Sequence, residues 1–133
     1  MLFCPLHPVK LVVAVLAFGT MALGSAAQAH PRLLAATPAA NETIASTKAL
    51  KLTFSEALVA QLSGMSVLMT DMPGMKMSAP MSVGAVKSKV GTDGKTLVGT
   101  LPTPLPTGTY TLGWHAVTAD THRVEGSYSF KVK

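Results

Sequence analysis

The chain has 133 residues, of which 48% are hydrophobic and only 13% charged, and its formal net charge at pH 7 is +5. Its lysines are scattered without a run of five or six, and few aromatic residues stand among them, which argues against a nucleic-acid-binding surface. After residue 29, no segment resembles a membrane span of about 20 apolar residues. We therefore expect a small globular monomer with no nucleic-acid partner.

The first 29 residues have the pattern of a secretory signal peptide. A short polar stretch ends at Lys10, an apolar segment covers residues 11–18, and small residues lead to an A-x-A end at Ala29. The apolar segment is shorter than a membrane span, so we expect cleavage between Ala29 and His30 rather than a retained anchor. Cleavage would remove Cys4, the single cysteine, and one lysine, leaving a cysteine-free secreted chain of net charge +4.

We expect residues 30–133 to form one domain, because about 100 residues is a usual size for a single core. Apolar and polar residues alternate with a period of two in several short segments, which is typical of half-buried strands. Turn residues separate these segments, and no stretch of ten or more residues has a helical stripe. The pattern predicts an all-β fold, a seven-stranded antiparallel Greek-key β-sandwich or barrel of the immunoglobulin-like type. The expected strands cover residues 32–36, 50–54, 65–69, 83–90, 96–100, 110–116 and 124–132.

Six of the eight methionines lie in one segment, residues 65–81. Met65 and Met69 have the inner parity of an expected strand, so core packing is the preferred explanation for them. The other four stand among two prolines, a glycine and a lysine, which indicates an exposed loop; they are Met72, Met75, Met77 and Met81.

Exposed loops seldom concentrate apolar side chains without a ligand or a partner. Thioether sulfur is soft and needs no deprotonation, so a cluster of such groups favours Cu(I) over Zn, Mg or Ca ions. The methionine loop therefore predicts a soft-metal site, with an adaptable protein-docking surface as the main alternative.

Three histidines would remain after cleavage: His30, His115 and His122. His30 would gain a free α-amine, and the amine and a ring nitrogen can chelate one metal ion. Cu(II) favours such nitrogen and oxygen ligands. Pro31 has no amide hydrogen, so its nitrogen cannot become an anionic ligand and the remaining places must be filled from elsewhere.

Asp120 and His122 are the natural suppliers, since residues two apart on an extended chain point to the same side. Glu56 follows a strand with matching parity and is a candidate for a further oxygen ligand or a hydrogen-bond acceptor behind the ligands. His115 has the parity opposite to Trp114, so we expect an outward-facing His115 and a core Trp114.

The hydroxyl groups form no recognisable catalytic triad, and the sequence has no Gly-rich phosphate loop. We therefore expect a protein that is not an enzyme. Two alternatives stay open: a copper-dependent oxidase or oxygenase that uses an N-terminal histidine chelate, and a docking module without a metal.

Taken together, these residues resemble the CopC/PcoC family of periplasmic copper-resistance proteins. The resemblance covers essentially the whole chain after residue 29 and is carried by His30-Pro31, residues 54–56, residues 69–75, Gly108-Thr109-Tyr110, Trp114, Asp120-Thr121-His122 and residues 130–133. It implies a cupredoxin-like or immunoglobulin-like β-barrel in the bacterial periplasm. It also implies a copper carrier for copper resistance and homeostasis, with separate sites for Cu(II) and Cu(I).

Carried onto this chain, the family's Cu(II) site falls on His30, Asp120 and His122, with Glu56 close to it. The family's Cu(I) loop falls on Met69, Met72, Met75 and Met81. The family's loop also contains a histidine, which this loop lacks, and Met77 occupies about that place. Arginine is usual in the family where His115 stands. Besides copper ions, the candidate partners are an inner-membrane copper transporter and a periplasmic copper oxidase.

Overall fold

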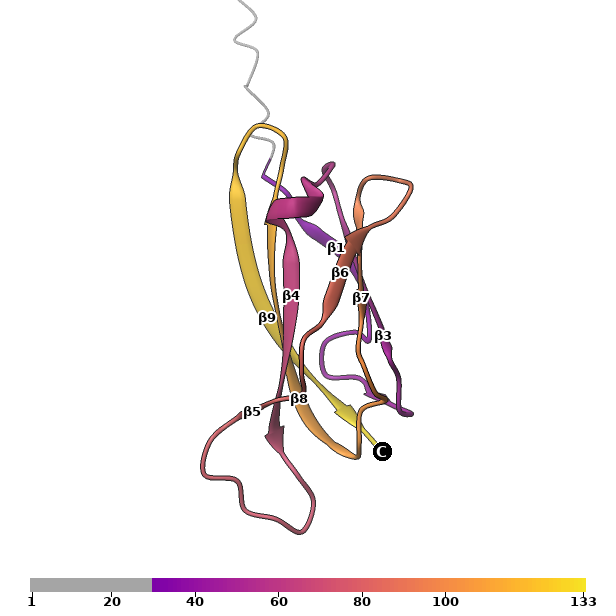
Figure 1. The fold of residues 1–133 in the computed structure, drawn as a ribbon, viewed down its shortest axis with the longest axis vertical. Coiled ribbons are helices and arrows are strands. Elements are labelled where there is room, and N and C mark those ends of the chain that lie inside the picture. The colour runs from indigo at the N-terminus through magenta and orange to yellow at the C-terminus, as the bar shows by residue number, and fades with distance from the viewer. Residues whose placement is uncertain (1–29) are drawn as a thin grey trace, which may run out of the picture.

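The computed structural model describes residues 30–133, which form two β-sheets packed face to face (Figure 1). The expected signal peptide, residues 1–29, lies outside the described residues. Within the described part, no helix is long and apolar enough to cross a membrane. One short 3₁₀ helix, η1 (Ala60–Leu62), precedes β4.

The four-stranded sheet has the order β1-β3-β7-β6, and all of its neighbouring strands are antiparallel. Its strands are β1 (Leu33–Thr37), β3 (Ala49–Phe54), β6 (Lys87–Val90) and β7 (Thr96–Thr100). The five-stranded sheet has the order β2-β9-β8-β4-β5, antiparallel except for the parallel pairing of β2 with β9. Its strands are β2 (Thr43–Ile44), β4 (Gly64–Asp71), β5 (Met81–Ser82), β8 (Gly108–Val117) and β9 (Arg123–Val132).

The all-β sandwich predicted from the sequence is confirmed, and each of the seven expected strands has a counterpart. Two differences have local causes. The strand expected over residues 83–90 is restricted to Lys87–Val90, because Gly84 adopts a φ of +105°, which interrupts the extended backbone. The strands β2 and β5 have only two residues each, too few to produce a pattern of alternation.

The core lies between the two sheets. It consists of the residues at alternating positions along the strands whose side chains point toward the opposite sheet. Leu50, Leu52 and Phe54 of β3 are fully buried, as are Leu112 of β8 and Leu97 of β7. Burying each such side chain contributes about 1.5–3 kcal/mol. Burial of one face of each strand produces the period-two pattern. This is why the pattern identified the strands correctly.

Trp114 differs from its expected place in the core. It is half-buried and packs edge-on against Phe54, with ring centres 5.0 Å apart. Its indole lies over Gly126 of the neighbouring strand, where an added Cβ would come within 2.7 Å of the ring. Because Gly126 has no side chain, the ring rests on the strand at the margin of the core.

Two tyrosine hydroxyls connect the strands to the segments between them. Tyr110 at the start of β8 donates a hydrogen bond to the carbonyl of Pro106, four residues upstream, at 2.5 Å. Tyr128 of β9 donates to the carbonyl of Pro38, just after β1, at 2.6 Å. These hydrogen bonds connect β8 and β9 to the segments that contain Pro106 and Pro38.

Burial, with a contribution from the charge of Glu42, raises the pKa of Tyr128 to about 12. An unfolded tyrosine has a pKa near 10, so the folded state favours the protonated phenol. The stabilisation from this group is complete below about pH 10 and is lost as the pH rises from about 10 to 12. We predict that Tyr128→Phe reduces the fall in unfolding free energy between pH 9 and pH 11.5, as measured by urea denaturation. An equal fall in both proteins would contradict the prediction.

Candidate metal centres

A tight hairpin between β8 and β9 positions Asp120 and His122. The Thr121 N–H donates to the Thr118 carbonyl at 2.9 Å, and the Thr118 N–H donates to the His122 carbonyl at 3.1 Å. Thr121 has a φ of +70°, the left-handed conformation that completes a three-residue hairpin loop. Asp120 therefore lies in the loop, and His122 is the first residue after it.

The side chains of Asp120 and His122 meet, with His122 Nδ1 3.0 Å from Asp120 Oδ2. Their proximity was predicted, but the reason was wrong, because the two residues lie in a turn and not on an extended strand. The left-handed Thr121 between them brings the backbone around, so that the His122 N–H also approaches Asp120 Oδ1 at 3.5 Å.

Hydrogen bonding stabilises Asp120 as a carboxylate. The Thr118 hydroxyl donates to Asp120 Oδ1, and this bond lowers the carboxyl pKa, with smaller contributions from the backbone N–H and the ring of His122. A carboxylate beside Nδ1 favours the imidazole form that carries its proton there and leaves Nε2 for a metal ion. Asp120 is therefore suited to orient His122 as well as to act as an oxygen ligand.

His30 lies beside this pair. Its ring centre is 5.3 Å from that of His122, with 38° between the ring planes. Two imidazoles that bind one ion at about 2 Å have centres about 4 to 6 Å apart, so the observed separation fits a shared ion.

The end of β3 holds this part of the chain in place. The Arg32 N–H donates to Ser55 Oγ, and the Ser55 N–H donates to the Arg32 carbonyl, both at 2.9 Å. Continuing this antiparallel register by one residue places the half-buried Glu56 opposite Pro31, next to His30. Glu56 therefore lies at the same end of the sandwich as the two histidines.

Within residues 30–133, no three side chains of His, Cys, Asp or Glu already form a set that could hold a metal ion. His30, Asp120 and His122 meet as pairs. The further donor expected at this end is the α-amine of His30, whose nitrogen belongs to a peptide bond in the 133-residue chain. Cleavage after Ala29 would convert that nitrogen into a ligand.

The methionine segment projects from the opposite end of the sandwich, between β4 and β5 (Figure 1). Met69 of β4 and Met81 of β5 are partners in the antiparallel register. Met72 and Met75 occupy the two ends of a turn, in which the Met75 N–H donates to the Met72 carbonyl at 3.1 Å. Within that turn, Pro73 is followed by Gly74 with a φ of +78°, the combination typical of a type II turn.

Three of the five predicted methionine ligands share a pocket of about 250 Å³. It is lined by Met69, Met72 and Met81 together with Ser82, Val83, Thr103, Pro104, Leu105 and Pro106. Met75 and Met77 are not among the lining residues. Met77 packs against the core, whereas Met75 is 60% exposed. Met65 and Met69 are buried, as core packing predicts, and Met69 also faces this pocket.

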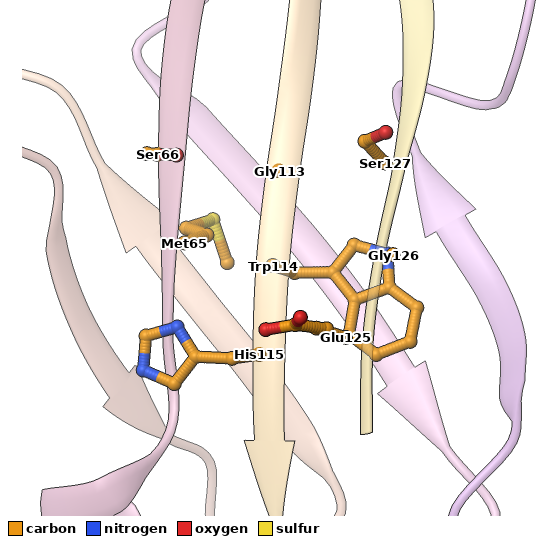
Figure 2. A pocket seen from close by; sticks show the side chains of 8 residues that line it. All are labelled: Met65, Ser66, Gly113, Trp114, His115, Glu125, Gly126 and Ser127. Carbon is orange, nitrogen blue, oxygen red and sulfur yellow. The ribbon is translucent and has the colours of Figure 1, made fainter. Parts of the chain in front are cut away.

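A shallow depression of about 500 Å³ was not predicted; it lies over β4, β8 and β9 (Figure 2). Gly113 stands there between its register partners Ser66 and Ser127, and the small side chains leave the surface hollow. The sequence signal was the coincidence of these three small residues, which becomes visible only once the register is known. The depression is separate from the two predicted centres.

His115 lies at one end of this depression beside Glu125, its register partner on β9 (Figure 2). The His115 ring lies against Gly64 of β4, where an added Cβ would approach the ring to 3.0 Å. His115 is half-buried, and Glu125 pairs with Arg123 at 3.4 Å. Two metal-binding side chains are too few to assign a metal centre here.

Comparisons with known proteins identify close relatives. The family model described as CopC domain matches residues 33–133. Copper resistance protein C of Pseudomonas syringae pv. tomato is 49% identical over 113 residues, which cover 85% of this chain and 88% of the relative. Copper resistance protein C of Xanthomonas campestris pv. juglandis is 47% identical over 109 residues, 82% of this chain and 84% of the relative.

The solved structures include a similar protein. The crystal structure of PcoC, a methionine-rich copper resistance protein from Escherichia coli, matches with a TM-score of 0.71 and 41% sequence identity. The match covers 79% of this chain and 100% of the PcoC chain. The sandwich described above is therefore the fold of PcoC.

We predict that Thr118→Val raises the pKa of Asp120 toward the ordinary value near 4, because valine keeps the volume of threonine but has no hydroxyl donor. A lowered carboxyl pKa contributes stability that is present above the unfolded pKa and lost as the pH falls through the folded pKa. The variant should therefore have a flatter acid stability profile. Carboxyl NMR titration measures the pKa, and Thr111→Val, remote from Asp120, is the control. An unchanged Asp120 pKa in Thr118→Val would show that the hydroxyl is not the cause.

Proposed function

Because the chain belongs to the CopC family of copper resistance proteins, we propose that it is a periplasmic copper-binding protein that carries or sequesters copper and is not an enzyme. One observation carries the proposal. The imidazoles of His30 and His122 lie 5.3 Å apart at the position where cleavage would create an amine. This end of the sandwich can therefore supply several nitrogen donors to one ion.

The proposed Cu(II) centre consists of the amine and imidazole of His30, the imidazole of His122 and the carboxylate of Asp120. The contact of Asp120 with His122 at 3.0 Å supports this set, and Glu56 lies near enough in the register to act as a further oxygen ligand or a hydrogen-bond acceptor. A set of nitrogen and oxygen ligands suits Cu(II), which at equal geometry binds more tightly than the other divalent first-row ions.

The proposed Cu(I) centre uses the thioethers of the methionine segment. Met69, Met72 and Met81 line one pocket, and Met75 and Met77 stand nearby in the sequence as further candidates. Neutral sulfur ligands favour a soft ion such as Cu(I) and provide little for the hard cations Mg²⁺ and Ca²⁺.

The two centres would respond differently to conditions, because they lie at opposite ends of the sandwich and have different ligands (Figure 1). The imidazoles and the amine must be deprotonated to bind, so Cu(II) affinity should fall in mild acid. Thioethers carry no proton to lose. Occupancy of the two centres would therefore depend on both the oxidation state and the pH.

The exposed methionines offer a route for copper to a partner. Met75 and Met81 are 60% and 55% exposed, and Met81 also lines the pocket. Flexible, polarizable methionine side chains suit an adaptable contact surface. We propose an inner-membrane copper transporter or a periplasmic copper oxidase as the partner that receives or delivers the ion.

The decisive test adds one glycine before His30 in the processed protein, which removes the α-amine from its position beside the ring. Loss of a ligand should exceed the 10- to 100-fold effect of losing a residue behind the ligands, so we predict a fall in Cu(II) affinity of at least about 100-fold. Competition with a chelator of known affinity measures it. His122→Ala should give a loss of the same order.

The matched control is His115→Ala, which removes a histidine of β8 that lines the separate depression. Its Cu(II) affinity should equal that of the unaltered protein. Unchanged affinity after addition of the glycine would refute the amine ligand. Oxidant-dependent turnover by the copper-loaded protein would support the oxidase or oxygenase alternative instead.

For the methionine centre, we predict that the double substitution Met72→Leu and Met81→Leu weakens Cu(I) binding at least tenfold. Leucine preserves the apolar volume but removes two of the three sulfur atoms at the pocket. A colorimetric Cu(I) chelator provides the measurement. Met65→Leu, in the core and outside this pocket, is the control and should bind Cu(I) as before. Equal affinity in all three proteins would exclude the pocket as the Cu(I) centre.

A further inference from the structure

The outer face of the four-stranded sheet gathers three exposed lysines. The register aligns Lys51 of β3, Val98 of β7 and Lys89 of β6 in one row across the sheet. Lys87 lies two residues before Lys89 on the same strand and has the same parity. Because Leu52 and Leu97, of opposite parity, are buried in the core, the lysine side chains lie on the solvent side.

This lysine face, defined as Lys51, Lys87 and Lys89, has no carboxylates among its strands. The strands β1, β3, β6 and β7 contain neither aspartate nor glutamate. The two ion pairs identified within residues 30–133 both lie on the β8–β9 side, at Asp120 and at Glu125. Lys48, which is exposed, extends the positive charge beyond the start of β3, whereas Lys95, before β7, lies beside the carboxylate of Asp93.

The charges are close together. Neighbouring strands lie about 4.8 Å apart, and residues two apart on a strand about 6.7 Å, so the backbone positions of the three lysines fall within about 12 Å of one another. Like charges at such spacing repel each other. A negatively charged surface would attract all three lysines and offset the repulsion between them.

Protection of a sheet edge explains only part of this arrangement. Lysines on an edge strand prevent unwanted strand pairing, and β6 is an edge strand, which covers Lys87 and Lys89. Lys51 stands on β3, an interior strand between β1 and β7. Its place in the same row as Lys89 therefore needs another reason.

The chemistry of the face favours a lipid surface over a protein. Between the lysines stand Val98, Thr53, Thr96 and Thr100, without the arginine and aromatic anchors that stabilise protein interfaces. Lysine is a strongly hydrated point charge, and clustered lysines are attracted to anionic headgroups through water. We propose that the lysine face docks on the surface of a bilayer that contains anionic phospholipids.

Docking in this orientation would leave both candidate metal centres accessible. The lysine face is a broad face of the sandwich, whereas the β8–β9 hairpin and the methionine segment lie at the two opposite ends of the sandwich (Figure 1). The proposal does not depend on copper binding, so it can be tested with the metal-free protein.

The test measures binding of the metal-free secreted protein to vesicles made of equal parts phosphatidylglycerol and phosphatidylcholine. Each lysine near an anionic surface contributes a factor of about five, so the triple variant K51Q/K87Q/K89Q should bind about a hundredfold more weakly. Binding should also weaken between 0.1 M and 1 M salt, where the Debye length falls from about 10 Å to 3 Å.

The matched control is K76Q/K131Q/K133Q, which removes the same charge from positions off the four-stranded sheet. It should lose less than tenfold. Equal losses of affinity in both triple variants would show that binding depends on net charge and not on the lysine face, and would overturn the proposal. Equal affinity of the unaltered protein for vesicles of pure phosphatidylcholine would also overturn it. Binding to polyglutamate but not to vesicles would point to an acidic protein partner and overturn it too.

Thermal unfolding checks that each triple variant is folded. If K51Q/K87Q/K89Q does not fold, the single substitution Lys51→Gln replaces it. Its expected loss is about fivefold, with Lys131→Gln as the control. No loss for Lys51→Gln would overturn the proposal.

Discussion

The pairing of β8 with β9 is the constraint on which both candidate centres depend. The two strands stay in register from Gly108 opposite Val132 to Val117 opposite Arg123, without a bulge. At one end, this register closes into the three-residue loop that brings Asp120 against His122. A slip of one residue would turn every side chain of a strand to the other face, so the buried core residues protect the geometry of the loop.

The same strand also organises the methionine end. β8 pairs with β4 on its other side, and this places Met69 opposite the buried Tyr110 and leaves it free to pair with Met81 of β5. The hydroxyl of Tyr110 holds the Pro106 carbonyl, and Pro106 contributes to the wall of the methionine pocket. The pocket is therefore built by strand pairing and a tyrosine hydrogen bond, and the turn at Pro73 and Gly74 supplies its third methionine, Met72.

Burial explains which features could be predicted from the sequence. The strands around Phe54 and Leu112 were predictable, because one face of each is buried and the alternation follows from it. The contact of Asp120 with His122 was predicted from an extended chain but arises from a turn. The turn could not be predicted, because a β-branched residue such as Thr121 rarely adopts the left-handed conformation. The position of Trp114 depends on Gly126, twelve residues later on a neighbouring strand, and the two residues are brought together only by the register of β8 and β9.

The two candidate centres also differ in the step that completes their set of ligands. The fold alone places Met69, Met72 and Met81 around one pocket, so the proposed Cu(I) centre requires nothing beyond a folded domain. At the other end, hydrogen bonds join Arg32 to Ser55, and the ring of His30 lies 5.3 Å from that of His122, but the fold cannot supply an amine. Pro31 removes the neighbouring amide as a substitute. The proposed Cu(II) centre therefore needs both folding and cleavage, and only a chain that has been processed after Ala29 can present the complete set of nitrogen donors.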